Sequence, residues 1–131
     1  MTQVGIAGFG TIGRVVARHI EASTLPLTLA AVSAGDRARA EAAMAGLARA
    51  VPIVGTDELV ALSDVVVDSA PTAAFRDIAT ATLVAGKTLV TVSGAALMQW
   101  PEAVDIARAH GGRIVLATGA LLGLDAVRAA A

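Results

Sequence analysis

Short runs of β-branched residues alternate with alanine-rich stretches of helical period along the whole chain. Strands separated by helices are joined by crossover connections, so they lie parallel in one sheet that helices cover. The expected strands are residues 3–7, 28–33, 51–54, 65–68, 89–93 and 114–118. The sequence therefore predicts an α/β fold, a doubly wound parallel six-stranded sheet in a three-layer α/β/α arrangement.

The expected helices lie between these strands and have recognisable ends. They span residues 11–22, 37–50, 72–85, 101–110 and a short piece around 122–131. A further helix begins near Thr56, which suits the N-cap position, and the two acidic residues that follow it suit the first helical turn. Gly86 would end one helix, and Pro101 suits the first position of another. The strand at residues 65–68 is the most apolar and is expected to be buried on both faces.

Composition excludes several classes of protein. The chain has 131 residues, a formal net charge of −1, two histidines and no cysteine. The length fits one domain, and the near-neutral charge indicates no nucleic-acid or membrane partner. Without cysteine there is no disulfide or thiol chemistry, and two histidines make a metal site unexpected. No apolar run suits a membrane span and no leader precedes the first strand, so we expect a cytoplasmic protein.

The most specific motif joins the first expected strand to the first helix. It reads Gly8-Phe9-Gly10-Thr11-Ile12-Gly13. In such a GxGxxG turn, the glycines allow a tight turn, close approach of a pyrophosphate, and close helix–strand packing. The N–H groups of Thr11, Ile12 and Gly13 would face phosphate oxygens at the positive end of the helix dipole. Turn and packing alone would also explain three glycines, but the strand–turn–helix context favours a dinucleotide site of the Rossmann fold.

The end of the second strand bears on which dinucleotide such a site would accept. An NAD site has an acid about 20 residues beyond the glycines, whereas this chain has Ser33 there. Ser33 together with Arg37 or Arg39 would suit the 2′-phosphate of NADP. Asp36 could instead reach a ribose diol, or serve only as the N-cap of the next helix, and both arginines could be solvated. The choice between NAD and NADP stays open, with a lean toward NADP or dual use.

Small residues also follow the later strands. Ser69 and Ala70 follow the fourth strand, while Ser93 and Thr118 stand at the ends of the fifth and sixth. Open parallel sheets bind ligands beyond the carboxyl ends of their strands, so we predict that these residues contact the cofactor. For Ser69 and Ala70, turn chemistry alone is the competing interpretation.

Hydride transfer also needs an acid–base group near the strand ends. His19 lies well along the first helix, and His110 and Lys87 belong to the opposite edge of the sheet. Asp68 is the best-placed carboxylate, but burial and capping explain it as readily. No pair or triad forms a catalytic set, and we predict no catalytic residue in this chain.

Four segments carry a more specific pattern: residues 4–13, 31–33, 91–97 and 118–125. Together they resemble the L-aspartate dehydrogenase family over essentially the whole chain. The two later segments are similar to the family patterns SxGAL and PSGAxxGLDA, with Ala117-Thr118 in place of the Pro-Ser pair. Glucose–fructose oxidoreductase-like enzymes and homoserine dehydrogenases fit less well, since they carry a lysine where this chain has Ser93-Gly94.

This resemblance implies an NAD(P)-dependent oxidoreductase that deaminates L-aspartate to iminoaspartate, which yields oxaloacetate and ammonia. It also implies a second α+β domain after the sixth strand, with the catalytic histidine and the dimer contacts. We therefore expect residues 1–131 to be the dinucleotide-binding domain, without the substrate domain and inactive alone.

The alternative is a non-catalytic module that senses NAD(P)(H) through a dimer or a partner. Leu121, Leu122 and Leu124 could supply such a contact face, or could contact the missing domain. A fold that keeps the glycines and binds nothing is a third hypothesis.

Overall fold

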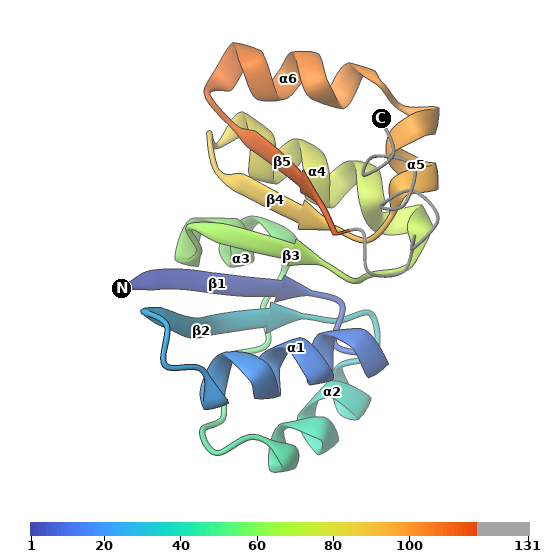
Figure 1. The fold of residues 1–131 in the computed structure, drawn as a ribbon. Helices are drawn as coiled ribbons and strands as arrows, with labels where there is room; N and C mark the ends of the chain where they lie inside the picture. The colour runs from blue at the N-terminus through green and yellow to red at the C-terminus, as the bar shows by residue number, and fades with distance from the viewer. Residues whose placement is uncertain (118–131) are drawn as a thin grey trace, which may run out of the picture.

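Five parallel strands form one sheet in the computed structural model, which describes residues 1–117 (Figure 1). They are β1 (Thr2–Ala7), β2 (Leu27–Ser33), β3 (Val65–Asp68), β4 (Thr88–Thr91) and β5 (Arg113–Leu116). The strand order is β2-β1-β3-β4-β5, and each neighbouring pair is parallel. The second strand, β2, lies on one side of β1, and the next strand in the sequence, β3, lies on the other side of β1. This reversal between β1 and β3 marks the ligand crevice of a doubly wound fold.

The predicted strand at residues 51–54 is reduced to one bridge, so the described part of the chain has five strands rather than six. Ile53 pairs with Val32 at the outer edge of β2. The N–H of Val32 donates to the Pro52 carbonyl at 3.0 Å, and the N–H of Val54 donates to the Val32 carbonyl at 2.8 Å. Pro52 has no N–H and Gly55 already caps the next helix, so no longer ladder forms.

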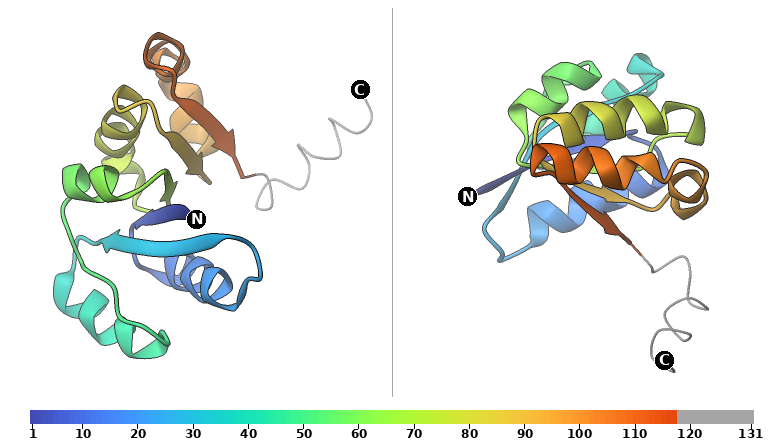
Figure 2. Two further views of the ribbon diagram at one scale, coloured as in Figure 1. Left: turned by 90° about the vertical axis from the view of Figure 1, so that its left-hand side faces the viewer. Right: turned by 90° about the horizontal axis from the view of Figure 1, so that it is seen from above.

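Helices cover both faces of the sheet, and the three-layer prediction is confirmed (Figure 2). The helices α1 (Thr11–Ala22) and α2 (Arg37–Ala43) pack on one face. On the other face lie α3 (Thr56–Leu62), α4 (Phe75–Val84) and α6 (Glu102–His110). Within residues 1–117, no helix is long and apolar enough to cross a bilayer.

Several element ends differ from prediction. The helix α2 ends at Ala43 and passes into the 3₁₀ turn η1 (Met44–Gly46), because glycine disfavours further helix. The 3₁₀ turn η2 (Thr72–Ala74) precedes α4, and Gly55 rather than Thr56 caps α3. Pro101 is the cap residue of α6, not its first residue. The short helix α5 (Gly94–Gln99) was not predicted, since six residues show no clear period.

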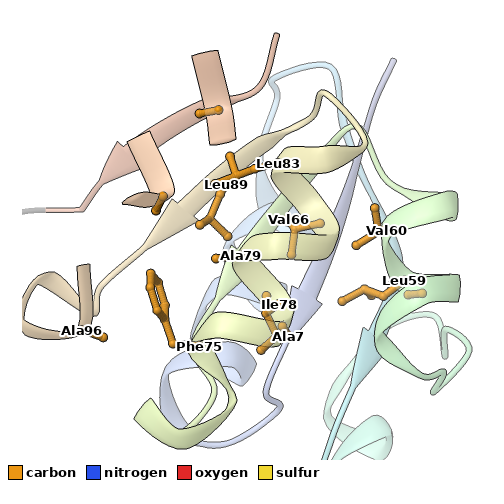
Figure 3. Close-up of a cluster of buried hydrophobic side chains, with 13 residues drawn as sticks. Ala7, Leu59, Val60, Val66, Phe75, Ile78, Ala79, Leu83, Leu89 and Ala96 are labelled. Atoms are coloured by element: carbon orange, nitrogen blue, oxygen red, sulfur yellow. The ribbon is translucent and has the colours of Figure 1, made fainter. Parts of the chain in front are cut away.

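Two apolar clusters hold the layers together, and Figure 3 shows the one beneath α3, α4 and α6. Phe75, Leu83 and Leu89 are almost fully buried there. The strand β3 contributes only one face to this cluster. Val66 and Asp68 are buried, whereas Val65 and Val67 are partly exposed. The prediction that residues 65–68 are buried on both faces holds fully on one face only. On the other face Val67 packs, partly buried, against the second cluster, because α1 contacts mainly β1 and β2.

The segment from residue 118 onward lies outside the described residues. It holds Thr118, the predicted helical piece at residues 122–131, and the three leucines considered as a contact face.

Candidate functional site

A groove of about 550 Å³ lies at the carboxyl ends of β1, β2 and β3, where the strand order reverses. Its volume falls within the range of about 300–1,000 Å³ that is usual for small-molecule sites. The loops after these three strands line it with Gly8, Phe9, Gly10, Thr11, Ala34, Gly35, Asp36, Arg39, Ala40, Ser69, Ala70 and Pro71. The fold thus brings together three loops that are far apart in the sequence.

Gly8 and Gly13 are required by the fold of the turn itself. Gly8 has φ +87°, and a Cβ on it would lie 2.6 Å from both Cα and N of Ala70. Its N–H donates to the Ser33 carbonyl at 2.9 Å, which joins the turn to the end of β2. Gly13 is buried, and a Cβ there would overlap the Gly8 carbonyl oxygen. The first and third glycines therefore have structural roles.

Gly10 differs from the other two glycines. Its φ is −88°, which any residue adopts, and a Cβ on it would meet no atom within 4 Å. Neither backbone strain nor packing within the protein explains a glycine at this position. A residue without a side chain here leaves the start of α1 open to the groove, as close approach of a phosphate requires.

The start of α1 offers free donors to this groove. Gly10 is the cap residue, and no side chain caps the helix. No acidic residue stands in the first turn of α1. The N–H groups at Thr11, Ile12 and Gly13 therefore keep the hydrogen-bonding capacity and partial positive charge that favour an anion. The Ile12 side chain is half exposed and does not line the groove, so only its backbone could serve there.

At the start of α2, the structure gives different contacts to Arg37 and Arg39, which the sequence could not distinguish. Arg39 lines the groove. Arg37 instead pairs with Glu41 (Nε to Oε1, 3.1 Å) and donates from Nη1 to the Ile53 carbonyl at 3.2 Å. Asp36 both lines the groove and caps α2, because its Oδ1 accepts from the Arg39 N–H at 3.1 Å. Ser33 is absent from the lining.

Ser69 ties the loop after β3 to the glycine turn. Its hydroxyl donates to the Gly8 carbonyl at 2.7 Å and lies 3.2 Å from the Ala7 carbonyl. Its backbone N–H also donates to the Ala7 carbonyl, at 2.8 Å. Ser69 therefore has a structural role in shaping the groove that it lines.

A buried polar pair lies beneath this loop. Asp68 and Thr91 are both 0% exposed, and the Thr91 hydroxyl donates to Asp68 Oδ2 at 2.8 Å. Asp68 Oδ1 accepts from the Ala70 N–H at 3.2 Å, and Thr91 Oγ1 accepts from the Ser93 N–H at 2.9 Å. Burial raises the pKa of the Asp68 carboxyl above its ordinary value of 3.8, and hydrogen bonds from Thr91, Ala70 and Ser93 oppose this.

Of the residues predicted to contact a cofactor, the groove gathers Gly8, Gly10, Thr11, Asp36, Ser69 and Ala70. Ile12, Gly13, Ser33, Arg37 and Ser93 do not line it, and Thr118 lies outside the described residues. The sequence interpretation did not include Phe9, Ala34, Gly35, Ala40 or Pro71, and it offered Arg39 only as an alternative to Arg37. The spacing of Arg37 four residues before Glu41 was the available signal that Arg37 is engaged on its own helix.

Comparisons with known proteins show the family of this domain. The family model described as the NAD-binding domain of homoserine dehydrogenase matches residues 8–117. The L-aspartate dehydrogenase of Bradyrhizobium diazoefficiens is 42% identical over 98% of this chain and 45% of its own length. L-aspartate dehydrogenase 3 of Bordetella bronchiseptica is 41% identical over 98% of this chain and 47% of its own length. The chain therefore spans about half the length of the curated relatives that it matches.

A solved homoserine dehydrogenase from Thiobacillus denitrificans has the same fold. The two superimpose with a TM-score of 0.74 at 18% sequence identity. The match covers 88% of this chain and 29% of that one, so it concerns one domain of a longer protein.

Proposed function

Since the chain belongs to the family of homoserine dehydrogenase NAD-binding domains, we propose that it is the dinucleotide-binding domain of an aspartate dehydrogenase-like oxidoreductase. One observation carries this proposal. The groove at the reversal of strand order is bounded by a GxGxxG turn whose middle glycine has open space beside it. That is where a doubly wound fold binds a dinucleotide.

The residues of the groove fit a dinucleotide in a definite order. The pyrophosphate would lie against the N–H groups at the start of α1, next to Gly10. The loop after β2, with Asp36 and Arg39, would hold the adenosine ribose. The loop at Ser69 and Ala70 would lie toward the nicotinamide half. When bound, the nicotinamide ring accepts or donates a hydride, and the chain's own part is to bind and orient it.

The substrate and the proton chemistry belong to the whole protein. By similarity to the named relatives, we propose oxidation of L-aspartate to iminoaspartate, followed by hydrolysis to oxaloacetate and ammonia. The substrate-binding and acid–base groups would lie in a second domain. A cytoplasmic location and a dimeric or partnered state stay predictions from the sequence.

Arg39 supports a preference for NADP. It is the arginine that lines the groove, and its backbone is held by the Asp36 cap at the start of α2. A guanidinium at the end of the second strand is suited to the 2′-phosphate that distinguishes NADP from NAD. No acid stands at the tip of β2, where an NAD site would have one to bind the 2′-hydroxyl.

Calorimetric titration of the chain with NADH and with NADPH tests both parts of the proposal. We expect binding of both, with NADPH tighter. Arg39→Ala should weaken NADPH binding about tenfold, because it removes one charge-assisted hydrogen bond to the 2′-phosphate. The same variant should change NADH binding little. Arg37→Ala is the matched control and should leave both affinities unchanged.

The outcomes separate the two claims. If neither dinucleotide binds to the folded wild type, the proposed function is wrong. If both bind but Arg39→Ala weakens them equally, the function stands and the NADP preference does not.

A further inference from the structure

We propose that Asp68 and Thr91 are positioning residues for the dinucleotide groove. In this proposal, the buried pair joins the loops that follow β3 and β4 and holds the Ser69-Ala70 wall of the groove against the glycine turn. The inference rests on the proposed function and assigns a role to two residues outside the groove lining.

A continuous set of hydrogen bonds joins the loops after β3 and β4 through Asp68 and Thr91. The Ser93 N–H donates to Thr91 Oγ1 at 2.9 Å, and the Thr91 hydroxyl donates to Asp68 Oδ2 at 2.8 Å. The other carboxylate oxygen accepts from the Ala70 N–H at 3.2 Å. The Asp68–Thr91 pair thus fixes the backbone of two loops, which follow the adjacent strands β3 and β4.

These hydrogen bonds end at the wall of the groove. Ala70 lines the groove and lies against Gly8 so closely that a Cβ on Gly8 would be 2.6 Å from the Ala70 nitrogen. That nitrogen is the one that donates to Asp68. The Asp68 carboxylate therefore holds the peptide of the groove wall that packs against the glycine turn.

The buried pair is polar although its neighbours on the same face are aliphatic. Asp68 and Thr91 are 0% exposed, beside Val66 and Leu89 on the same face of β3 and β4. Aliphatic side chains would fill this space without desolvating a carboxylate. They could not accept from the Ala70 N–H or the Ser93 N–H. The polar pair is suited to fixing loop position, which apolar packing alone would not do.

Thr91→Val and Thr91→Ser form the decisive pair of variants. Valine keeps the shape of threonine but has no hydroxyl, so it breaks both the link to Asp68 and the link to Ser93. Serine keeps the hydroxyl. We expect Thr91→Val to weaken NADH binding about tenfold while far-UV circular dichroism stays that of the wild type. Thr91→Ser should bind NADH within about twofold of the wild type.

Hydrogen exchange without ligand gives a readout that loss of stability alone would not produce. In Thr91→Val, the amides of Ala70 and Ser93 should exchange faster, while the amides of β1 and β2 keep the wild-type rates. Thr91→Ser should restore slow exchange at both positions. Faster exchange throughout the sheet would indicate general destabilisation and would overturn the positioning role.

Asp68→Asn provides a second test that does not depend on the folding of Thr91→Val. A carboxylate accepts at both oxygens, whereas an amide accepts at only one, so either Ala70 or Thr91 loses its acceptor. We expect weaker NADH binding here too. Wild-type affinity in folded Asp68→Asn or folded Thr91→Val would overturn this inference alone. Failure of the wild type to bind NADH would overturn the proposed function and this inference with it.

Discussion

The three glycines of the turn differ in what would surround an added methyl group. At Gly8 and Gly13 the methyl group would meet backbone atoms of the protein, whereas at Gly10 it would meet open space. The fold therefore explains two of the glycines, Gly8 and Gly13, but not Gly10, which we propose lies against the pyrophosphate of a dinucleotide. Substitution by alanine can separate these roles.

We predict that Gly10→Ala weakens binding of NADH and NADPH at least tenfold with little change in thermal stability. A methyl group there would occupy the space that a pyrophosphate needs, and the protein around it would not have to move. Gly13→Ala is the contrasting variant and should lower the free energy of unfolding by about 1–3 kcal/mol, as overpacking does. Titration and thermal unfolding measure the two effects. Unchanged affinity in Gly10→Ala would contradict the placement of the pyrophosphate.

Asp68 predicts a specific dependence of stability on pH. Burial raises its pKa in the folded state above 3.8, so the folded state binds more protons than the unfolded state between these two pKa values. The contribution of Asp68 to the free energy of unfolding should therefore fall as the pH rises through this window and stay level above it.

Urea unfolding of the wild type and Asp68→Asn from about pH 3 to pH 8 measures this effect. The stability of the wild type relative to the variant should decrease as the pH rises. A relative gain with rising pH would show that the hydrogen bonds from Thr91 and Ala70 outweigh the burial of the carboxylate.

At the scale of single elements, the helix ends show how local sequence and tertiary contact combine. Gly86 follows α4 with φ +73°, and Gly111 ends α6 with φ +72°. Glycine near the end of a helix is a strong local signal, and both positions follow from the sequence. Their surroundings differ, since a Cβ on Gly86 would lie 2.8 Å from the His110 carbonyl oxygen and one on Gly111 would meet nothing within 4 Å.

We predict that Gly111→Ala lowers the free energy of unfolding by about 1 kcal/mol, the ordinary cost of a left-handed alanine. Gly86→Ala should cost more, because the same backbone strain is joined by a contact with the His110 carbonyl. Denaturant unfolding of both variants compares them directly. Equal losses of stability in the two variants would show that the His110 carbonyl moves away from the added methyl group without a loss of free energy.

Element boundaries were predicted well where local chemistry determines them. The helix at residues 11–22 and the strand at residues 65–68 have the predicted bounds. The strand at residues 51–54 failed because a proline and a nearby helix cap leave room for only one bridge. The prediction that β3 is fully buried on both faces failed on the face that carries Val65 and Val67. Burial of that face depends on how far α1 extends across the sheet, and no local sequence pattern encodes this.

At the scale of the whole molecule, the chain spans about half the length of the relatives that it matches. We predict that it binds a nicotinamide dinucleotide but does not oxidise L-aspartate by itself. Mixing the chain with L-aspartate and NAD⁺ or NADP⁺ should form no reduced dinucleotide, measured by absorbance. Titration of the same preparation with NADPH serves as the control for a competent groove. Aspartate-dependent formation of NADH or NADPH would contradict the claim that the acid–base group lies elsewhere.

The sequence alone determined the alternation of strands with helices, the parallel sheet and the glycine turn. These follow from periodicity and turn chemistry, which act over a few residues. It also indicated Asp36, Ser69 and Ala70 as candidates, since the ends of parallel strands meet at one edge of the sheet.

Only the tertiary structure decided which side chains reach the groove. It directs Arg39 into the lining and Arg37 to Glu41, and it joins Asp68 to Thr91 across two strands. These outcomes depend on contacts between segments distant in the chain, such as the Arg37 bond to the Ile53 carbonyl. Local propensity carries no information about such contacts, because they form only when the layers pack.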